Sequence, residues 1–139
     1  MLALGALGYK RGVPFRGLLE RLVKSERSAR GAIFCDHEGE AVALSLAEVP
    51  PRGCAPIGEY DLKVCGAQMA APVLALMAAA AAGGAGPPKE LRMLCEHGTL
   101  ACRVLRDGYY VALLLAPGGR SAGAPGKLAA VSALVLAEM

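Results

Sequence analysis

The sequence predicts a single small domain of the α+β class, with helices and strands in the order αββαβββα. Three short turn segments indicate the strands, because each lies between apolar runs as in a hairpin: Asp36-His37-Glu38-Gly39, His97-Gly98-Thr99 and Asp107-Gly108. Apolar residues at helical spacing indicate the helices. At 139 residues, the chain is long enough to bury a core of its own.

The first predicted helix follows Pro14, a residue suited to the first helical turn. Apolar residues then recur three and four positions apart, which indicates a helix with one apolar face: Phe15, Leu18, Leu19, Leu22 and Val23. Residues 32–35 and 41–46 are the strands of the first predicted hairpin. Five prolines and glycines in residues 47–58 exclude a helix or a central strand there, so this segment is a predicted loop.

A second helix is predicted from Asp61, a suitable N-cap, to about Ala82, with a kink caused by Pro72. This helix is apolar almost all round, and one small sheet covers only one side of a helix. Small residues at positions 66, 67, 70 and 71 would let another helix approach closely, so we expect a helix pair across a homodimer. The alternative is a merely alanine-rich helix, since exposed alanine costs little.

The second half of the chain predicts three strands and a last helix. Glycines and prolines at residues 83–88 end the second helix. Residues 90–96, 100–106 and 109–115 then read as strands joined by short turns. The last helix begins at Ala124 or Pro125, and its apolar residues recur at helical spacing at positions 128, 131, 134 and 135.

The composition favours a chain that covers part of its surface with another molecule. Hydrophobic residues make up 55% of the sequence without counting glycine, and charged residues only 19%. Globular domains average about 45–50% apolar residues with glycine included. This excess excludes intrinsic disorder. It indicates a subunit that hides an apolar surface against a partner or a copy of itself.

An uncharged segment, residues 64–82, is not predicted to insert into a membrane. It consists largely of alanine, which is nearly neutral toward lipid, and Gln68 and Pro72 interrupt it. At the N-terminus, Lys10 and Arg11 follow the apolar residues, whereas in a signal peptide the charges come first. The five cysteines lack the spacing of a disulfide framework and fit free thiols in a reducing compartment. We therefore expect a cytoplasmic protein.

Positive charge is concentrated near the N-terminus. Residues 10–30 contain seven Lys or Arg and two Glu, whereas the whole chain has a net charge of +3. A basic helix can meet nucleic acid, an anionic membrane or an acidic protein, but a solvated helix face is the commoner explanation. Nucleic-acid binding is not predicted, because the chain has no Trp and only two Phe to form stacking platforms.

Two triplets, Cys35-Asp36-His37 and Cys95-Glu96-His97, contain the thiols and imidazoles of a zinc site. Each Cys ends a predicted strand and each His lies in the following turn, unlike the ligand pairs of a zinc knuckle. No group that would orient the imidazole is evident for a Cys-His nucleophile. We therefore predict neither a metal site nor catalytic residues here, and interpret the triplets as turn residues.

The segment 118–128 follows a predicted strand and precedes a helix, which is the context of a phosphate-binding loop. Its residues do not fit that motif. Ser121 stands where the first glycine is needed, Leu128 stands where a hydroxyl would bind magnesium, and Pro125 lacks a backbone N–H. No nucleotide or other cofactor is therefore predicted.

Several short motifs follow one another in a characteristic order. Residues 30–36 and 38–43 form a strand, an acidic-glycine turn and a second strand, and Tyr60-Asp61-Leu62 precedes the alanine-rich helix. Residues 98–100 and 105–109, and Ser121-Ala122-Gly123 before the last helix, continue the series. Together with the element order, these motifs resemble the Roadblock family of dynein light-chain-like domains, most closely its bacterial MglB-like branch. The predicted domain spans residues 14–139, after an N-terminal extension of residues 1–13.

The resemblance implies a single five-stranded antiparallel sheet in the order 2-1-5-4-3, an α/β sandwich with helices on both faces. It also implies a homodimer through the middle helix and the third strand, which agrees with the all-round apolar helix. Residues 90–96 are then the edge strand that pairs with its copy. The expected dimer interface consists of Leu62, Cys65, Gly66, Met69, Val73, Leu76, Leu91 and Met93.

The function that the resemblance implies is that of a non-enzymatic regulator or scaffold that binds a small Ras-like GTPase. MglB-like members stimulate GTP hydrolysis by that partner. Arg52 and Arg120, in predicted loops, could supply a positive charge to the partner, but solvated side chains are the commoner explanation. Two alternatives stay open: an adaptor that only dimerises, and a PAS- or GAF-like domain with a ligand cavity lined by Ala43, Ala101 and Ala112. The residues that touch the partner are not predicted.

Overall fold

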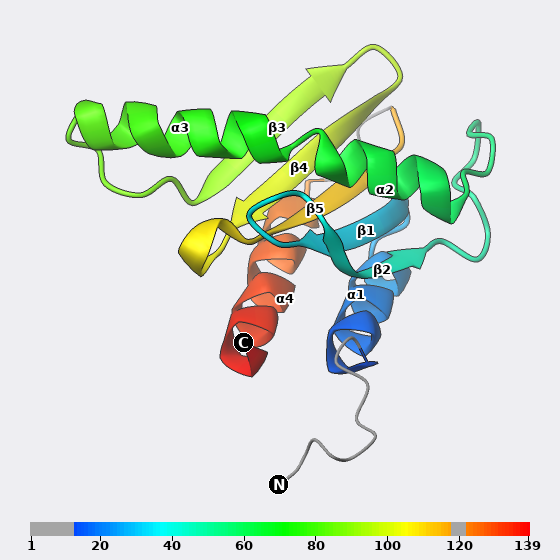
Figure 1. Ribbon diagram of the computed structural model, residues 1–139. Helices are drawn as coiled ribbons and strands as arrows, with labels where there is room; N and C mark the ends of the chain where they lie inside the picture. The colour runs from blue at the N-terminus through cyan, green and yellow to red at the C-terminus, as the bar shows by residue number, and fades with distance from the viewer. Residues whose placement is uncertain (1–12, 118–121) are drawn as a thin grey trace, which may run out of the picture.

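The computed structural model describes residues 13–117 and 122–139, and its elements follow the predicted order (Figure 1). Of the predicted N-terminal extension, residues 1–12 lie outside the described part. The elements are α1 (Val13–Ser25), β1 (Ala29–Cys35), β2 (Ala41–Leu46), α2 (Glu59–Ala67), α3 (Ala70–Ala82), β3 (Glu90–Cys95), β4 (Gly98–Val104), a 3-10 turn η1 (Arg106–Gly108), β5 (Tyr110–Leu115) and α4 (Ala124–Glu138).

The five strands form one antiparallel sheet in the order β2-β1-β5-β4-β3, which confirms the predicted fold class and strand order. The first and third strands along the chain are therefore far apart, and β2 and β3 are the edges. Asp36 closes the turn between β1 and β2. Its carboxylate accepts hydrogen bonds from the backbone N–H groups of Glu38 at 2.9 Å and Glu40 at 3.0 Å.

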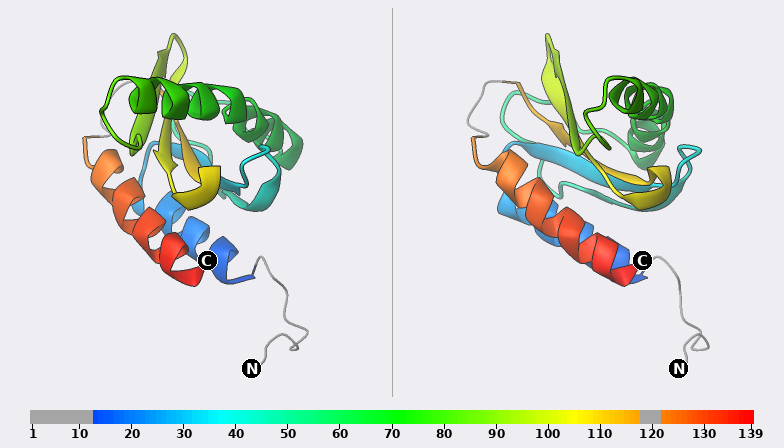
Figure 2. Two further views of the ribbon diagram at one scale, coloured as in Figure 1. Left: turned by 60° about the vertical axis from the view of Figure 1, so that its left-hand side comes forward. Right: turned by 90° about the vertical axis from the view of Figure 1, so that its left-hand side faces the viewer.

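Helices cover both faces of the sheet (Figure 2). The helices α1 and α4 lie side by side on one face, and α2 lies on the other against β1 and β2. Because successive strand residues point to opposite faces, β1 contributes to two cores. Ala32 and Phe34 pack with α1 and α4, whereas Ile33 and Cys35 pack beneath α2. The domain is thus a three-layer sandwich with the sheet in the middle.

The predicted middle helix is broken at Gln68 and Met69 into α2 and α3. The break lies where Pro72 requires it. Proline has no N–H to donate to the carbonyl four residues earlier, and its ring clashes with that carbonyl, here that of Gln68. Pro72 itself lies in the first turn of α3, where backbone N–H groups have no partner within the helix. The proline therefore starts a new helix, which confirms the predicted interruption.

Gly66 lets α2 lie close to the sheet. A Cβ at this position would be 2.9 Å from Ile33 Cγ2, a distance that real Cβ atoms essentially never show, and 3.1 Å from Cys35 Sγ, which is tighter than most real contacts. The carbonyl of Gly66 also accepts a buried hydrogen bond of 2.8 Å from the hydroxyl of Tyr110 on β5. This bond satisfies the polar end of a fully buried ring and fixes α2 on the sheet.

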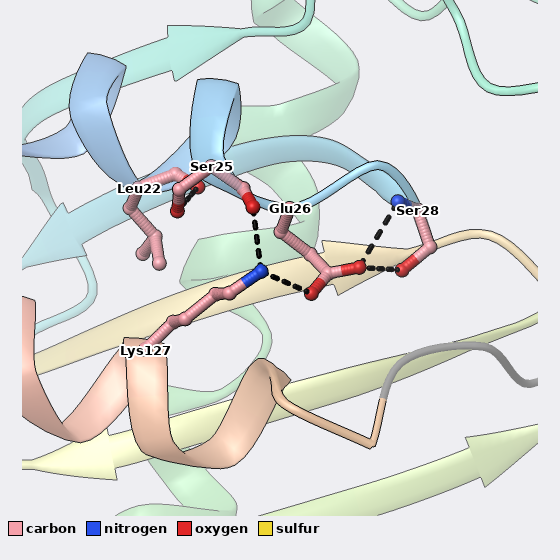
Figure 3. Close-up of polar contacts among 5 residues, drawn as sticks. All are labelled: Leu22, Ser25, Glu26, Ser28 and Lys127. Atoms are coloured by element: carbon pink, nitrogen blue, oxygen red, sulfur yellow. Dashed lines mark hydrogen bonds and ion pairs between the residues drawn. The ribbon is translucent and has the colours of Figure 1, made fainter.

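Lys127 of α4 links the two helices of the opposite face (Figure 3). Its ammonium donates to the carbonyl of Ser25, at the end of α1, and lies 3.4 Å from the Glu26 carboxylate. Glu26 is only 4% exposed and also accepts hydrogen bonds from the backbone N–H and the hydroxyl of Ser28. Burial opposes ionisation of this carboxyl, but the bonds from Ser28 and Lys127 outweigh it and hold its pKa below the usual value.

The last predicted hairpin turn differs from the simple two-residue form. Asp107 and Gly108 lie in η1 between β4 and β5, and the backbone closes with a 2.7 Å bond from the N–H of Leu105 to the carbonyl of Tyr109. Both turn residues have positive φ, 58° for Asp107 and 79° for Gly108. Asp and Gly tolerate this left-handed conformation better than other residues do, which explains the sequence of the turn.

Candidate interaction surface

Most of the exposed large hydrophobic side chains lie on three elements, α2, α3 and β3. Of nine such residues in the described part of the chain, six lie on α2, α3 and β3: Tyr60, Val64, Leu74, Leu76, Met93 and Leu94. Leu74 is 66% exposed and Leu94 is 79% exposed. We define the α3–β3 surface as Leu74, Leu76, Met93, Leu94 and the open edge of β3. Gathered exposed apolar residues of this kind mark interaction sites in soluble proteins.

The helix α3 is apolar all round and mostly uncovered. It contains no charged or hydrogen-bonding side chain, and Val73 is its one buried residue. Val73 faces the sheet together with Met69, so Leu74, about a quarter turn away on the helix, points to another side. In Figure 2, the helix lies along the outer side of the sheet beside β3. A helix without a polar side needs a second apolar neighbour.

Within the described part of the chain, the strand β3 pairs only with β4, so its other edge is open. The N–H of Val104 bonds to the carbonyl of Lys89, its directly opposite residue. In antiparallel strands, bonded and non-bonded pairs alternate. Residues 91, 93 and 95 therefore bond toward β4, whereas Glu90, Arg92 and Leu94 direct their backbone groups to the open edge. An open edge of this kind can pair with another strand.

Charged side chains lie on one face of this edge strand. Glu90 accepts a 3.0 Å bond from Arg92, two residues along β3, and lies 3.4 Å from Arg103 on β4. These side chains are on the face of α1 and α4. Leu91 and Met93, at alternate positions, face α2 and α3 instead, and Leu91 packs against the core there. The strand thus presents a charged face and an apolar face.

The structure divides the eight residues of the expected dimer interface into two groups. Leu62, Met69 and Val73 are 1–2% exposed, and Gly66 is also buried, because all four face the chain's own sheet. Cys65 and Leu91 are half-buried, whereas Leu76 and Met93 are exposed. The close approach expected of Gly66 is made to β1 of the same chain.

Leu74 and Leu94 are the two residues of the α3–β3 surface that the sequence analysis did not select for the interface. A helix with apolar residues on every side gives no periodicity that tells which side faces its own sheet. Leu62 and Gly66 face the sheet, and their positions define the inner side of the helix. Leu74 does not lie on that side, so it could have been predicted to be exposed. Successive residues of a strand point to opposite faces of the sheet, so Leu94 lies on the other face from Met93. No interface was predicted on that face.

The cysteines on the α2 face differ in exposure. Cys35 and Cys102 are fully buried, Cys65 is half-buried and Cys95 is exposed. Burial raises the pKa of the Cys35 thiol to about 11 and that of Cys102 to about 12. Thiols that stay protonated at neutral pH are poor nucleophiles and poor metal ligands. These two cysteines are therefore core residues.

The other candidate sites lie apart from this surface or outside the described residues. Cys35 ends β1 and Cys95 ends the antiparallel β3, so the two Cys-acid-His triplets lie at opposite ends of the sheet. Arg52 is exposed in the loop after β2. Arg120 and Ser121 lie outside the described residues. Ala101 and Ala112 are buried in the packed cores, one on each face of the sheet.

The basic residues of α1 form a solvated face on the side away from the α3–β3 surface. Arg16, Arg21 and Lys24 are exposed, as is Arg27 in the turn after the helix, and Arg16 forms an ion pair with Glu20 at 3.6 Å. The opposite face of α1 packs Leu19, Leu22 and Val23 into the core. This is the amphipathic pattern predicted for the helix.

By length and composition alone, the segment Glu59–Ala82 is apolar enough to cross a membrane. In the structure, 17% of its most apolar 18-residue stretch is buried. In the fold, the segment is one layer of the sandwich. Leu62, Gly66, Met69 and Val73 pack on the sheet, and α2 carries the charges of Glu59, Asp61 and Lys63. The exposed apolar residues of this segment lie on the sides of α2 and α3 that do not pack on the sheet.

No protein-family model and no curated protein matches this sequence. Solved structures do match its fold. MglB of Myxococcus xanthus has 12% identity and a TM-score of 0.74, over 93% of this chain and 90% of that one. A structure described as MglB with a tetrameric arrangement has 18% identity and a TM-score of 0.74, over 94% and 88% of the two chains.

A Roadblock/LC7 domain from Streptomyces avermitilis is also similar. It has 13% identity and a TM-score of 0.71, over 86% of this chain and 92% of that one. These likenesses cover nearly the whole of each chain, so they compare complete sheets with their helices. The chain therefore has the Roadblock/LC7 fold in the form found in MglB, as the sequence motifs predicted.

Proposed function

We propose that this chain, which has the Roadblock/LC7 fold, is a non-enzymatic cytoplasmic regulator that forms a homodimer and binds a small Ras-like GTPase. The observation that carries the proposal is the α3–β3 surface, where an apolar helix side and an open strand edge lie next to each other. A second copy of the chain offers the same two elements in return, as a two-fold interface requires.

The apolar helix and the open strand edge are better suited to contact with a second copy of the chain than to contact with water. Pairing the two β3 edges would satisfy backbone groups and join two five-stranded sheets into one. The same arrangement would bring Met93 and the side of α3 that carries Leu74 toward the other chain, whereas Leu76 lies about 200° further around the helix. Burying large apolar side chains contributes about 1.5–3 kcal/mol each, so a few such residues suffice to favour association.

The backbone directions restrict how two copies of β3 can pair. A two-fold axis perpendicular to the sheet keeps every side chain on its own face, so the axis must pass midway between one residue and the copy that lies directly opposite it. If that residue is Arg92, then Glu90 lies opposite Leu94 of the second copy, and all three outward-directed residues bond across the interface. Centres at Met93 or Leu94 leave Glu90 without a strand residue opposite. We therefore propose a register centred on Arg92.

The charges on β3 are compatible with this register. Two Arg92 side chains would face each other, which alone would be unfavourable. Each is already paired with Glu90 of its own strand, and Glu90 would lie diagonally across from the second Arg92. The four side chains then alternate in sign around the axis. This neutralisation removes the repulsion that would otherwise oppose the pairing.

The GTPase part of the proposal rests on the family resemblance and on the shared fold with MglB. A dimer presents two equal surfaces to a partner, and regulation of hydrolysis would follow if those surfaces favour the conformation in which the partner's own catalytic groups are ordered. Neither Arg52 nor any other residue is assigned a direct role in hydrolysis.

The experiment that tests this function measures phosphate release from GTP by a Ras-like GTPase of the same organism. Wild-type protein is expected to bind the GTPase and to raise its rate, and a variant that stays monomeric is expected to lose the effect. Binding without any change of rate would favour the adaptor alternative instead. Absence of binding in both nucleotide states would contradict the proposal.

A further inference from the structure

A cavity of about 390 Å³ lies on the face of α1 and α4, at the end of the sheet away from the β3–β4 turn. It is lined by the start of α1, the end of α4, β1, β2 and η1. Figure 1 shows the first turn of α1 and the last turn of α4 at this end of the molecule. Cavities that hold small molecules have volumes of about 300–1,000 Å³. This one is therefore large enough for a small ligand.

Three aromatic side chains form one wall of the cavity: Phe15 of α1, Phe34 of β1 and Tyr109. The rings of Phe15 and Phe34 meet edge to face with centroids 4.9 Å apart, and those of Phe34 and Tyr109 are 5.8 Å apart. Phe34 is fully buried, so the cluster is held in place by the core. Aromatic faces attract cations because the ring carries negative charge above its plane.

The charges around the opening also favour a cation. Among the described residues that line the cavity, Asp107 and Glu138 carry carboxylates and Arg106 carries a guanidinium. Among residues 13–117 and 122–139, no ion pair joins these three side chains. The carbonyls at the end of α4 add partial negative charge. At the start of α1, Pro14 lacks an N–H, which removes one of the donors that an anion would use.

We propose that this cavity binds a small organic cation with an apolar body, such as a substituted ammonium ion. The apolar part would lie against Phe15 and Tyr109, and the charged part would lie near Asp107 and Glu138. This site is independent of the proposed dimer, because none of its residues belongs to the α3–β3 surface. A failure of one proposal therefore leaves the other to be judged separately.

Choline and its neutral isostere 3,3-dimethylbutanol form a matched pair of probes. They have nearly the same shape, and only choline carries a charge. Titration of the full chain, followed by the NMR signals of Phe15 and Tyr109, is expected to give saturable shifts with choline and about tenfold weaker binding of the isostere, as cation–π contacts predict. No saturable shift at millimolar choline would overturn the proposal. If the isostere binds as tightly as choline, the cavity does not recognise the positive charge, and the proposal that its ligand is a cation would be overturned.

The variant Asp107→Asn removes one carboxylate without disturbing the backbone. Position 107 has φ 58°, and asparagine adopts this conformation as readily as aspartate does. We expect choline binding to weaken about fivefold, as for loss of one partly exposed charge partner, and to weaken further in Asp107→Asn/Glu138→Gln. The matched control is Glu48→Gln, which removes an exposed charge in the loop after β2 and is expected to bind choline normally. Equal affinities of the double variant and the control would contradict the site.

Discussion

Two buried thiols give the molecule a specific response to alkaline pH. Cys35 and Cys102 lie beneath α2, and burial raises their pKa values to about 11 and about 12. In the unfolded chain, these thiols release their protons near pH 9, but in the folded chain they keep them. Their protonated state therefore favours folding fully below pH 9, and this contribution is lost as the pH rises toward 11 or 12.

The variant Cys102→Ala isolates this effect for one residue. At pH 8, wild type is expected to be the more stable protein by about 1 kcal/mol, because alanine fills less of the core. Between pH 9 and 11, the free energy of unfolding of wild type is expected to fall relative to that of the variant by up to about 1.4 kcal/mol per pH unit, so that the variant becomes the more stable protein at the upper end of this range. Urea denaturation at a series of pH values measures it. A difference independent of pH would show that the thiol is not protected from ionisation.

Glu26 is expected to stabilise the contact between α1 and α4 only while it is ionised. Its folded pKa is lowered, so the unfolded chain takes up the proton first as the pH falls. The stabilisation is fully present above about pH 4.5 and is lost below it. We expect Glu26→Gln to lower the free energy of unfolding at pH 7 by about 1–3 kcal/mol, since a buried carboxylate loses its bonds to Ser28 and Lys127.

The pH dependence distinguishes this role from a simple packing role. The difference between wild type and Glu26→Gln is expected to diminish as the pH falls below 4.5, when the wild-type carboxylate is protonated. The exposed Glu48→Gln is the control and is expected to change stability by less than about 0.5 kcal/mol at either pH. Thermal or urea unfolding at pH 7 and pH 3 checks both variants. An unchanged difference at pH 3 would exclude ionisation as the cause.

At the scale of single elements, the register of β3 against its copy is testable by cysteine substitution. In a register centred on Arg92, this residue and its copy are directly opposite, with Cα atoms about 5.5 Å apart. Disulfides span Cα distances of about 4.4–6.8 Å. In a Cys95→Ser background, we expect Arg92→Cys to form an intermolecular disulfide on mild oxidation, measured by non-reducing electrophoresis.

Neighbouring positions supply the controls for the register. Met93→Cys and Leu94→Cys, in the same background, report registers shifted by one and by two residues along each strand. They are expected to form little disulfide. A preferred disulfide at either position would move the centre of the interface, and none at any position would argue against paired β3 edges. The mass in solution tells whether a dimer without strand pairing remains.

The order and type of the elements could be predicted from sequence because local signals agree with the fold. Asp36 and Gly39 mark a turn that the structure closes through the Asp36 carboxylate, and Pro72 marks the helix break. The positive φ of Asp107 and Gly108 likewise agrees with their residue types. The order of the strands in the sheet could not be predicted from local patterns alone, because such patterns do not determine which strands become neighbours. It followed from the resemblance and is confirmed.

The inner and outer sides of the middle helix could not be separated from sequence in the same way. Apolar residues surround the helix, so periodicity did not distinguish Met69, which packs in the core, from Leu74, which is exposed. The cavity near Asp107 also escaped prediction. Its wall combines Phe15, Phe34 and Tyr109 from three elements that only the tertiary fold brings together. Features made by distant segments have no local signal.

At the scale of the whole molecule, the account depends on association of two chains through the α3–β3 surface. The most direct measurement is the molar mass in solution, by light scattering, of wild type and two matched variants. Leu74→Arg places a charge on the α3–β3 surface, where the side chain is 66% exposed and does not support the core. Val49→Arg places the same charge at another exposed apolar position, in the loop after β2.

We predict twice the mass of one chain for wild type and Val49→Arg, and the mass of a single folded chain for Leu74→Arg. A charge buried in a dimer interface without a partner costs several kcal/mol, enough to prevent association. Circular dichroism confirms that the variants are folded. A wild-type mass of one chain, or a Leu74→Arg dimer as stable as wild type, would contradict the central claim.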